Sequence, residues 1–315
     1  MISKIRINNT DIGLGERVKL LLEVAKLPTH TPLHLPVYVL RGKAPGPTLL
    51  LTASLHGDEV NGTETIRRLI CKKALMPESG TILAMPIVNV YGFLGQSRDL
   101  PDGKDLNRSF PGREGGSLAR RLAHILLEEI VTHADYGIDL HTGGARRTNF
   151  PQVRCDFSRS GSLSLGKAFG APFLKNSPEI SGSFRKAASQ LGKDIIVYEG
   201  GESQRCDELA ISEAMDGIHR VMAHLDMVKR EVSARESLIL EKSKWVRARI
   251  AGMLRTTVDT GEPVRKGETL AIIGDPYGEM EHIVKAPFDG FIIGLNNQPV
   301  VHAGDAIIHL GQTKD

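Results

Sequence analysis

The sequence predicts an α/β fold, in which a mainly parallel sheet carries helices on both faces, followed by a small all-β domain. Short apolar runs such as Leu49–Leu55 are typical of buried parallel strands. They alternate with amphipathic segments such as Leu118–Ile130, as in a sheet covered by helices. After Trp245 the chain changes to short alternating runs and turn residues without a helical period, which indicates an all-β domain. The predicted domains are residues 1–240 and 245–315.

The composition indicates an ordinary globular protein, with 41% hydrophobic residues and a net charge of +3. This charge is too small and too evenly spread to predict nucleic-acid binding. The amino terminus lacks an apolar signal core, and no apolar run approaches membrane-spanning length. Three widely spaced cysteines argue against a disulfide framework. We therefore expect a soluble cytoplasmic protein whose partners include neither nucleic acid nor membrane; a homo-oligomer is compatible with the sequence.

The predicted elements alternate along the chain. The expected strands are Val37–Leu40, Thr48–Leu55, Thr81–Val88, Tyr136–Leu140 and Ile195–Tyr198. The expected helices are Glu64–Leu75, Leu118–Ile130, Ser181–Leu191 and Asp207–Met227. A long polar loop is predicted at residues 89–116, and loops of this length in compact domains are usually functional. A second predicted loop carries Arg146, Arg147 and Arg154, which we interpret as solvated charges in preference to an anion site.

Residues that can bind a metal follow the predicted strands. His56 and Glu59 stand where a strand stops and a helix begins, at the sheet edge where α/β proteins bind ligands. His141 and Glu199 follow two other predicted strands. Two histidines and one glutamate leave a zinc ion one open position, and a further carboxylate can accept a proton from water. The alternative is that each residue is structural or simply exposed. Neither GxGxxG nor GxxxxGK[ST] is present at a strand end, so nucleotide binding lacks support.

Four separated motifs strengthen the metal hypothesis. They are HGDE (56–59), DLNRSFPG (105–112), DLHTG (139–143) and YEGG (198–201). In this order they resemble the succinylglutamate desuccinylase/aspartoacylase family, which belongs to the larger group of zinc carboxypeptidases. The resemblance covers about residues 36–225 and implies an appended β domain. It also implies that His56, Glu59 and His141 bind one zinc ion per chain, and that Glu199 is the general base.

Further roles are implied by the same resemblance. Asn107 and Arg108 match the pair that holds the substrate carboxylate, a task that suits a planar guanidinium. Asp105 matches an aspartate that orients a zinc-bound imidazole, with Asp139 as the alternative. Arg98 lies where relatives polarise the scissile carbonyl.

The carboxyl-terminal segment resembles a second fold. The runs GEPVRKGETLAII and KAPFDGFI are similar to those of the biotinyl and lipoyl carrier fold, over about residues 249–311. Glu279 stands where a carrier needs its attachment lysine, so the fold is expected without the carrier function.

The resemblance to the succinylglutamate desuccinylase/aspartoacylase family implies a zinc-dependent hydrolase that cleaves the amide bond of an N-acyl amino acid or a related small N-acyl amine. One alternative is a zinc carboxypeptidase that acts on peptides. The other is a binding module in which the α/β part is inactive and the carrier-like part engages a partner. The sequence leaves the acyl group and the amine undefined.

Overall fold

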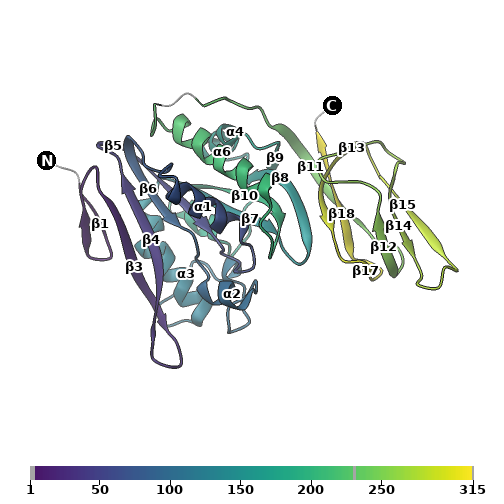
Figure 1. Cartoon of the computed structure of the whole chain (residues 1–315), viewed down its shortest axis with the longest axis horizontal. Helices are drawn as coiled ribbons and strands as arrows, with labels where there is room; N and C mark the ends of the chain where they lie inside the picture. Colours follow the sequence, from purple (N-terminus) through teal and green to yellow (C-terminus); the bar gives the residue numbers. More distant parts are fainter. Residues whose placement is uncertain (1–3, 230–231, 314–315) are drawn as a thin grey trace.

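The computed structural model describes residues 4–229 and 232–313, and over these ranges the chain has an α/β fold. A twelve-stranded sheet runs through the molecule, with helices packed on it and a four-stranded sheet at the carboxyl-terminal end (Figure 1). No helix in the described ranges is long and apolar enough to cross a membrane.

Five strands come first, helices and strands are interspersed from there to residue 224, and only strands follow in the described ranges. The helices are α1 (Asn61–Cys71), α2 (Val90–Gly95), α3 (Leu118–Glu129), α4 (Ser160–Phe169), α5 (Phe184–Gln190) and α6 (Glu208–His224), with 3-10 turns η1 (Leu106–Arg108) and η2 (Val131–His133). The strands of the first part are β1 (Ile5–Ile7), β2 (Thr10–Ile12), β3 (Arg17–Lys26), β4 (Pro32–Arg41), β5 (Ala44–Ala53), β6 (Ser79–Met85), β7 (Tyr136–Gly143), β8 (Arg147–Cys155), β9 (Phe173–Asn176) and β10 (Asp194–Glu202). The later strands are β11 (Leu238–Arg247), β12 (Gly252–Thr256), β13 (Pro263–Val264), β14 (Thr269–Gly274), β15 (Glu281–Lys285), β16 (Gly290–Asn296), β17 (Val300–Val301) and β18 (Ala306–Thr313).

The large sheet is mixed, whereas the sequence predicts a mainly parallel one. Its central strands β6, β5, β7 and β10 pair in parallel. On one side of this central group, β8 pairs antiparallel with β10. On the other side, β3 and β4 form an antiparallel hairpin. Parallel pairing occurs again further out, between β8 and β9, which are joined by α4, and between β9 and β11.

Helices cover both faces of the sheet because successive residues of its strands point to opposite sides. Leu50 packs into the core formed with α3 and α5. Leu49 and Leu51, its neighbours on β5, pack into the core formed with α1, α4 and α6. Burial of both faces explains why the β5 segment reads as a continuous apolar run.

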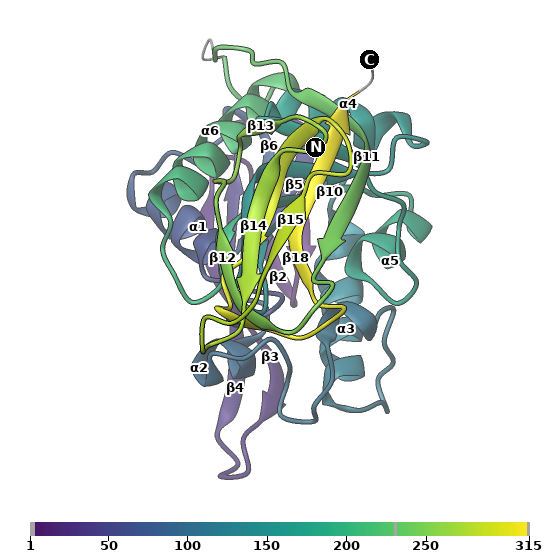
Figure 2. The same ribbon diagram turned by 90° about the vertical axis from the view of Figure 1, so that its right-hand side faces the viewer.

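The carboxyl-terminal strands continue the large sheet. Strand β11 pairs in parallel with β9, and β16 pairs antiparallel with β8. Strands β12, β14, β15 and β17 form the separate four-stranded sheet, of which β12, β14 and β15 lie toward the viewer in Figure 2. One hydrophobic core fills the space between these layers. The large sheet thus runs from one predicted domain into the other, and the division into two domains stays a prediction.

One predicted loop is wrong. The segment expected to be a charged loop contains β8, α4 and β9, and it places Arg147 and Arg154 on β8. Strand β8 includes Pro151, although proline cannot donate to a sheet ladder. Strands β7 and β10 also extend further than predicted, so His141 and Glu199 lie within strands instead of after them.

Candidate metal and catalytic site

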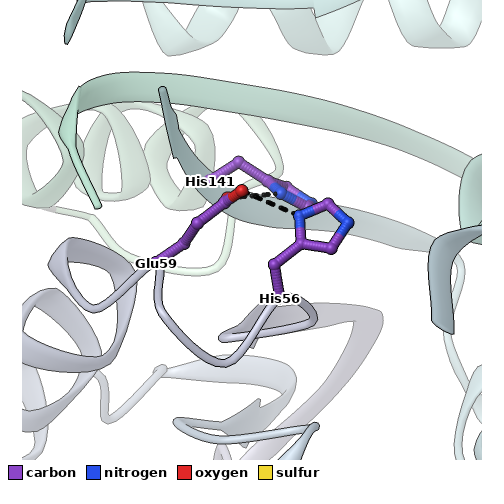
Figure 3. Close-up of side chains that lie close together, drawn as sticks. All are labelled: His56, Glu59 and His141. Carbon is purple, nitrogen blue, oxygen red and sulfur yellow. Dashed lines mark hydrogen bonds and ion pairs between the residues drawn. The ribbon is translucent and has the colours of Figure 1, made fainter. Parts of the chain in front are cut away.

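Three buried side chains converge at the carboxyl ends of β5 and β7. The nitrogen and oxygen atoms that His56, Glu59 and His141 could offer to a metal all lie within 4.8 Å of one another (Figure 3). His56 Nδ1 is 2.8 Å from Glu59 Oε1, and His141 Nδ1 is 2.8 Å from Glu59 Oε2. Imidazole nitrogens and carboxylate oxygens this close either share protons or direct their lone pairs at one cation.

The turn after β5 creates this convergence. Ser54 adopts a left-handed conformation with φ of 48°, and its hydroxyl donates to Glu59 O at 3.1 Å. Gly57 packs so tightly on α2 that a Cβ would lie 1.9 Å from the carbonyl carbon of Gly92. A side chain at position 57 would therefore displace the turn. Asn61 ties the turn to β10, because its amide donates to Gly200 O at 3.1 Å.

The outer nitrogens of both imidazoles face carboxylates. His141 Nε2 is 2.7 Å from Asp139 Oδ2, and His56 Nε2 is 3.3 Å from Asp105 Oδ1. Both aspartates considered from the sequence thus contact a histidine, each a different one. A carboxylate behind an imidazole fixes the ring and directs the opposite nitrogen inward, as at many metal sites. Glu59 is held as well, by the backbone N–H of Thr142 at 3.0 Å.

The electrostatics of this cluster favour a cation. Burial alone would lower the pKa of His141, but Asp139 and Glu59 outweigh it and hold that pKa well above its usual value. Burial would raise the pKa of Glu59, yet His56 and His141 keep it well below the usual range. The cluster thus retains protons between its members, and a divalent cation can replace them. Two imidazole nitrogens and one carboxylate are a donor set that fits zinc.

Glu199 lies beside this cluster, since it pairs with His141 in the register of β10 and β7. Its side chain is 9% exposed, and both of its oxygens are engaged from β8. Arg154 Nη1 is 3.0 Å from Oε1, and the Asn149 amide donates to Oε2 at 2.8 Å. Sequence reasoning missed Asn149 and interpreted Arg154 as solvated. Only the pairing of β8 with β10 brings them to Glu199, and no local pattern signals it.

The other predicted residues lie in the wall of the same pocket. Arg98 Nη1 is 3.2 Å from His56 Nδ1, and its Nη2 donates to Asp105 Oδ2 at 2.9 Å. Asn107 Oδ1 accepts from the backbone N–H of Phe184 at 2.9 Å. Arg108 is exposed, and its Nη1 donates to the backbone oxygen of Asn107 at 2.7 Å.

Comparison with known proteins identifies the family. A model of the succinylglutamate desuccinylase/aspartoacylase catalytic domain matches residues 45–225. The chain belongs to the succinylglutamate desuccinylase/aspartoacylase family. It is 30% identical over 290 residues to N-alpha-acetyl-L-2,4-diaminobutyric acid deacetylase from Halomonas elongata, an alignment that covers 87% of this chain and 84% of the deacetylase.

Several solved structures have a similar fold. The product-bound ectoine utilization protein EutE (DoeB) from Ruegeria pomeroyi is 26% identical, with a TM-score of 0.84 over 99% of this chain and 98% of that one. A succinylglutamate desuccinylase/aspartoacylase from Rhodobacter sphaeroides is 25% identical, with a TM-score of 0.84 over 95% of this chain and 96% of that one.

In this member of the desuccinylase/aspartoacylase family, the carboxyl-terminal strands complete the pocket. The pocket has a volume of about 580 Å³, and Trp245 of β11 and His309 of β18 line it. Their rings stack with centroids 4.5 Å apart. Gly294 of β16 lies between Asn149 and His309, and a Cβ there would be 2.9 Å from Asn149 Oδ1. Sequence reasoning assigned no site residue to this segment, because its approach to the pocket depends on the pairing of β16 with β8.

Proposed function

We propose that this chain is a zinc-dependent deacylase that hydrolyses the amide bond of a small N-acyl amino acid or related N-acyl amine. The observation that carries the proposal is the buried His56, Glu59 and His141 donor set, with Glu199 at its side. Membership of a family whose relatives are named as deacetylase and desuccinylase supports the same reaction.

The zinc ion would be held by His56, Glu59 and His141, where it would supply Lewis acidity for the scissile carbonyl. Glu199 would take one proton from the attacking water while the water oxygen adds to the carbonyl carbon. The carbon–nitrogen bond then breaks, and Glu199 would return the proton to the leaving amine nitrogen. The contacts from Arg154 and Asn149 hold the Glu199 carboxylate in place for both transfers.

Arg98 and Arg108 would act on the substrate. Arg98 lies 3.5 Å from Glu59 Oε1, so its guanidinium is beside the donor set and suited to polarising the carbonyl. Arg108 has one nitrogen engaged by the Asn107 backbone, and its exposed fork could bind the substrate carboxylate. The aspartates at positions 105 and 139 would orient the two imidazoles.

The pocket favours small substrates over peptides. Its volume of about 580 Å³ lies within the range of small-molecule sites. Trp245 and His309 form a wall from the carboxyl-terminal strands, which would restrict an extended chain. This wall weighs against the carboxypeptidase alternative, and the clustered charged groups weigh against an inactive binding module.

Zinc content and amine release from a panel of N-acetyl and N-succinyl amino acids test the proposal. We expect about one zinc per chain and turnover of at least one member of the panel. Peptides with a blocked amino terminus serve as the comparison substrates. A zinc-loaded protein that released a carboxyl-terminal residue from peptides and left every N-acyl amino acid intact would support the carboxypeptidase instead.

A further inference from the structure

A second cavity lies in the carboxyl-terminal part of the chain, and it contains none of the proposed metal ligands or catalytic residues. Its volume is about 470 Å³, and its walls come from residues between 244 and 249 on one side and between 282 and 287 on the other. The first wall belongs to β11 of the large sheet, and the second to β15 of the four-stranded sheet (Figure 2). The cavity is therefore a groove along the seam between the two sheets.

The groove meets both strands at their edges. Consecutive residues of each strand, 244–247 and 282–285, line it, whereas the face of a strand would contribute only every second residue. Strand β15 ends its sheet and pairs with β14 alone. Strand β11 pairs with β18 on one edge, and on its other edge β9 covers only Leu238–Leu240. In the described ranges both edges therefore present backbone N–H and C=O groups without a sheet partner, as a site for an added strand does.

The groove also carries positive charge that no carboxylate of its lining balances. Four permanent cations and one imidazole line it: Lys244, Arg247, Arg249, Lys285 and His282. None of these side chains forms an ion pair with another residue of the ranges 4–229 and 232–313. Arg247 Nη1 donates to the backbone oxygen of Gly304 at 2.7 Å, and the neighbouring Glu281 is directed to Arg255, 3.8 Å away. Several charges of one sign along a groove attract a ligand of the opposite sign.

Apolar surface lies between the basic residues. Each wall has the same order, in which two apolar residues stand between two basic ones: Trp245 and Val246 on β11, Ile283 and Val284 on β15. Ile283 is 53% exposed, so this surface is open to a ligand. A nucleic acid would neutralise the cations but would leave the strand edges and the apolar residues unused. An extended peptide with acidic and apolar side chains matches all three features of the groove.

A second copy of this chain fits the groove less well. A two-fold contact through the groove would bring the same surface of both chains together. The four permanent cations of one groove would then face those of the other, and like charges oppose association.

We propose that this groove binds an extended acidic segment of another protein. The segment pairs its backbone with the exposed strand edges, directs apolar side chains at Trp245 and Ile283, and places its carboxylates beside the basic residues. The groove is a docking site in addition to the proposed deacylase site, and its occupation requires no catalysis. Trp245 lines both cavities, so the two sites share one wall.

The probe is a fluorescein-labelled heptapeptide amide in which four glutamates alternate with valine, threonine and valine. Its binding to the full chain is followed by fluorescence anisotropy, beside a peptide with glutamine in place of every glutamate. We expect the Kd of the acidic peptide to be lower by at least about tenfold, the scale of one hydrogen bond to a charged group. Two further peptides carry N-methyl groups on their odd or their even residues. At least one of them should bind about tenfold more weakly than the unmethylated peptide, because main-chain hydrogen bonds to a strand edge are lost.

Charge reversal locates the site. Arg249→Glu combined with Lys285→Glu should raise the Kd of the acidic peptide by at least about tenfold, since two attractive contacts become repulsive. The matched control is Arg265→Glu combined with Lys266→Glu, which makes the same change in net charge at exposed positions outside the groove. The control should bind the peptide almost as the wild type does. Neither pair lines the pocket at His56, so zinc content and amide hydrolysis should match the wild type in both variants.

Several outcomes would overturn the inference. Equal binding of the glutamate and glutamine peptides, or equal weakening by both double variants, would show that the groove does not recognise an acidic segment. Binding that ignores N-methylation and is weaker than that of a single-stranded oligonucleotide of equal charge would assign the groove to nucleic acid. Displacement of the peptide by excess N-acetylglutamate would place the peptide in the other pocket. A dimer in sedimentation experiments that the Arg249→Glu and Lys285→Glu variant dissociates would make a second copy the occupant.

Discussion

Arg154 and Glu199 are diagonal neighbours on the antiparallel strands β8 and β10, with Arg154 Nη1 3.0 Å from Glu199 Oε1. The ion pair and the Asn149 amide occupy both carboxylate oxygens. Glu199 is therefore held in one orientation beside His56, Glu59 and His141, as its proposed role as general base would require. The orientation of this carboxylate thus depends on two residues of β8 as well as on β10, which carries it.

Glu199→Gln keeps the shape of the side chain but cannot accept a proton. We expect it to retain zinc while the turnover number falls by at least about a hundredfold, the usual scale of general base catalysis. Glu202→Gln on the same strand is the control, since Glu202 pairs with Arg205 at the strand end and does not line the pocket. Near-normal turnover in Glu199→Gln would assign the base elsewhere.

Arg154→Met removes one of the two contacts that hold Glu199. We expect turnover to fall by about tenfold with unchanged zinc content, the scale of one charge-assisted hydrogen bond. If Arg154 acts through Glu199, the double variant with Glu199→Gln should be little worse than Glu199→Gln alone. Fully multiplicative losses would mean that Arg154 contributes independently.

His141→Ala removes one of the three groups that converge on the proposed zinc site. We expect the purified variant to contain little zinc, as measured by elemental analysis, and to lose activity with it. Asp139→Asn keeps the ligand but weakens the partner behind it, so zinc affinity should fall by about 10- to 100-fold. His133→Ala, at the η2 turn outside the pocket, should bind zinc normally. Full zinc occupancy in His141→Ala would contradict the site.

Arg108 tests whether substrates must carry a carboxylate. Arg108→Ala should lose about 2 to 5 kcal/mol of transition-state stabilisation for N-acyl amino acids if the pair is desolvated, and little for their amides or esters. Arg108→Lys keeps the charge without the planar fork, so it should recover only part of the loss. The measurement is kcat/KM for both substrate types with all three proteins. Equal losses on both types would make Arg108 a structural residue.

His309 should make the protein sensitive to acid. Its pKa is lowered to about 2 in the folded chain, mainly by burial, and it is about 6.5 when unfolded. Below pH 6.5 the unfolded state therefore binds a proton that the folded state does not, and the free energy of unfolding falls. His309→Phe keeps a ring against Trp245 and removes this proton. From pH 7 to pH 5 the metal-free variant should lose about 2 kcal/mol less stability than the metal-free wild type, as measured by urea unfolding. Equal losses would show that His309 is protonated in the folded state.

The sequence was most informative where chemistry is local. His56 and Glu59 are three residues apart at a strand end, so their convergence requires only one turn. The apolar runs of the central strands likewise predict their own burial. Local pattern also predicts the helices, although their ends differ from the expected ones by a few residues.

The pairing of strands that are distant along the chain could not be predicted from the sequence. Asn149 and Arg154 reach Glu199 only because β8 pairs with β10, and Trp245 and His309 reach the pocket only because β11 and β16 join the same sheet. Polar residues on β8 face the pocket, and Pro151 interrupts its pattern, so the segment looks like a loop. The mixed order of the sheet has the same origin, since strand direction depends on partners that are distant along the chain.

The pairing of β11 with β9 has a consequence for any shortened form of this chain. Without the carboxyl-terminal strands, β9 would become an edge strand with a free row of backbone N–H and C=O groups. Such an edge is a template for pairing with other chains. A protein that ends after α6 would therefore be prone to aggregate. In the full chain, β11 covers this edge of β9 and so prevents such pairing.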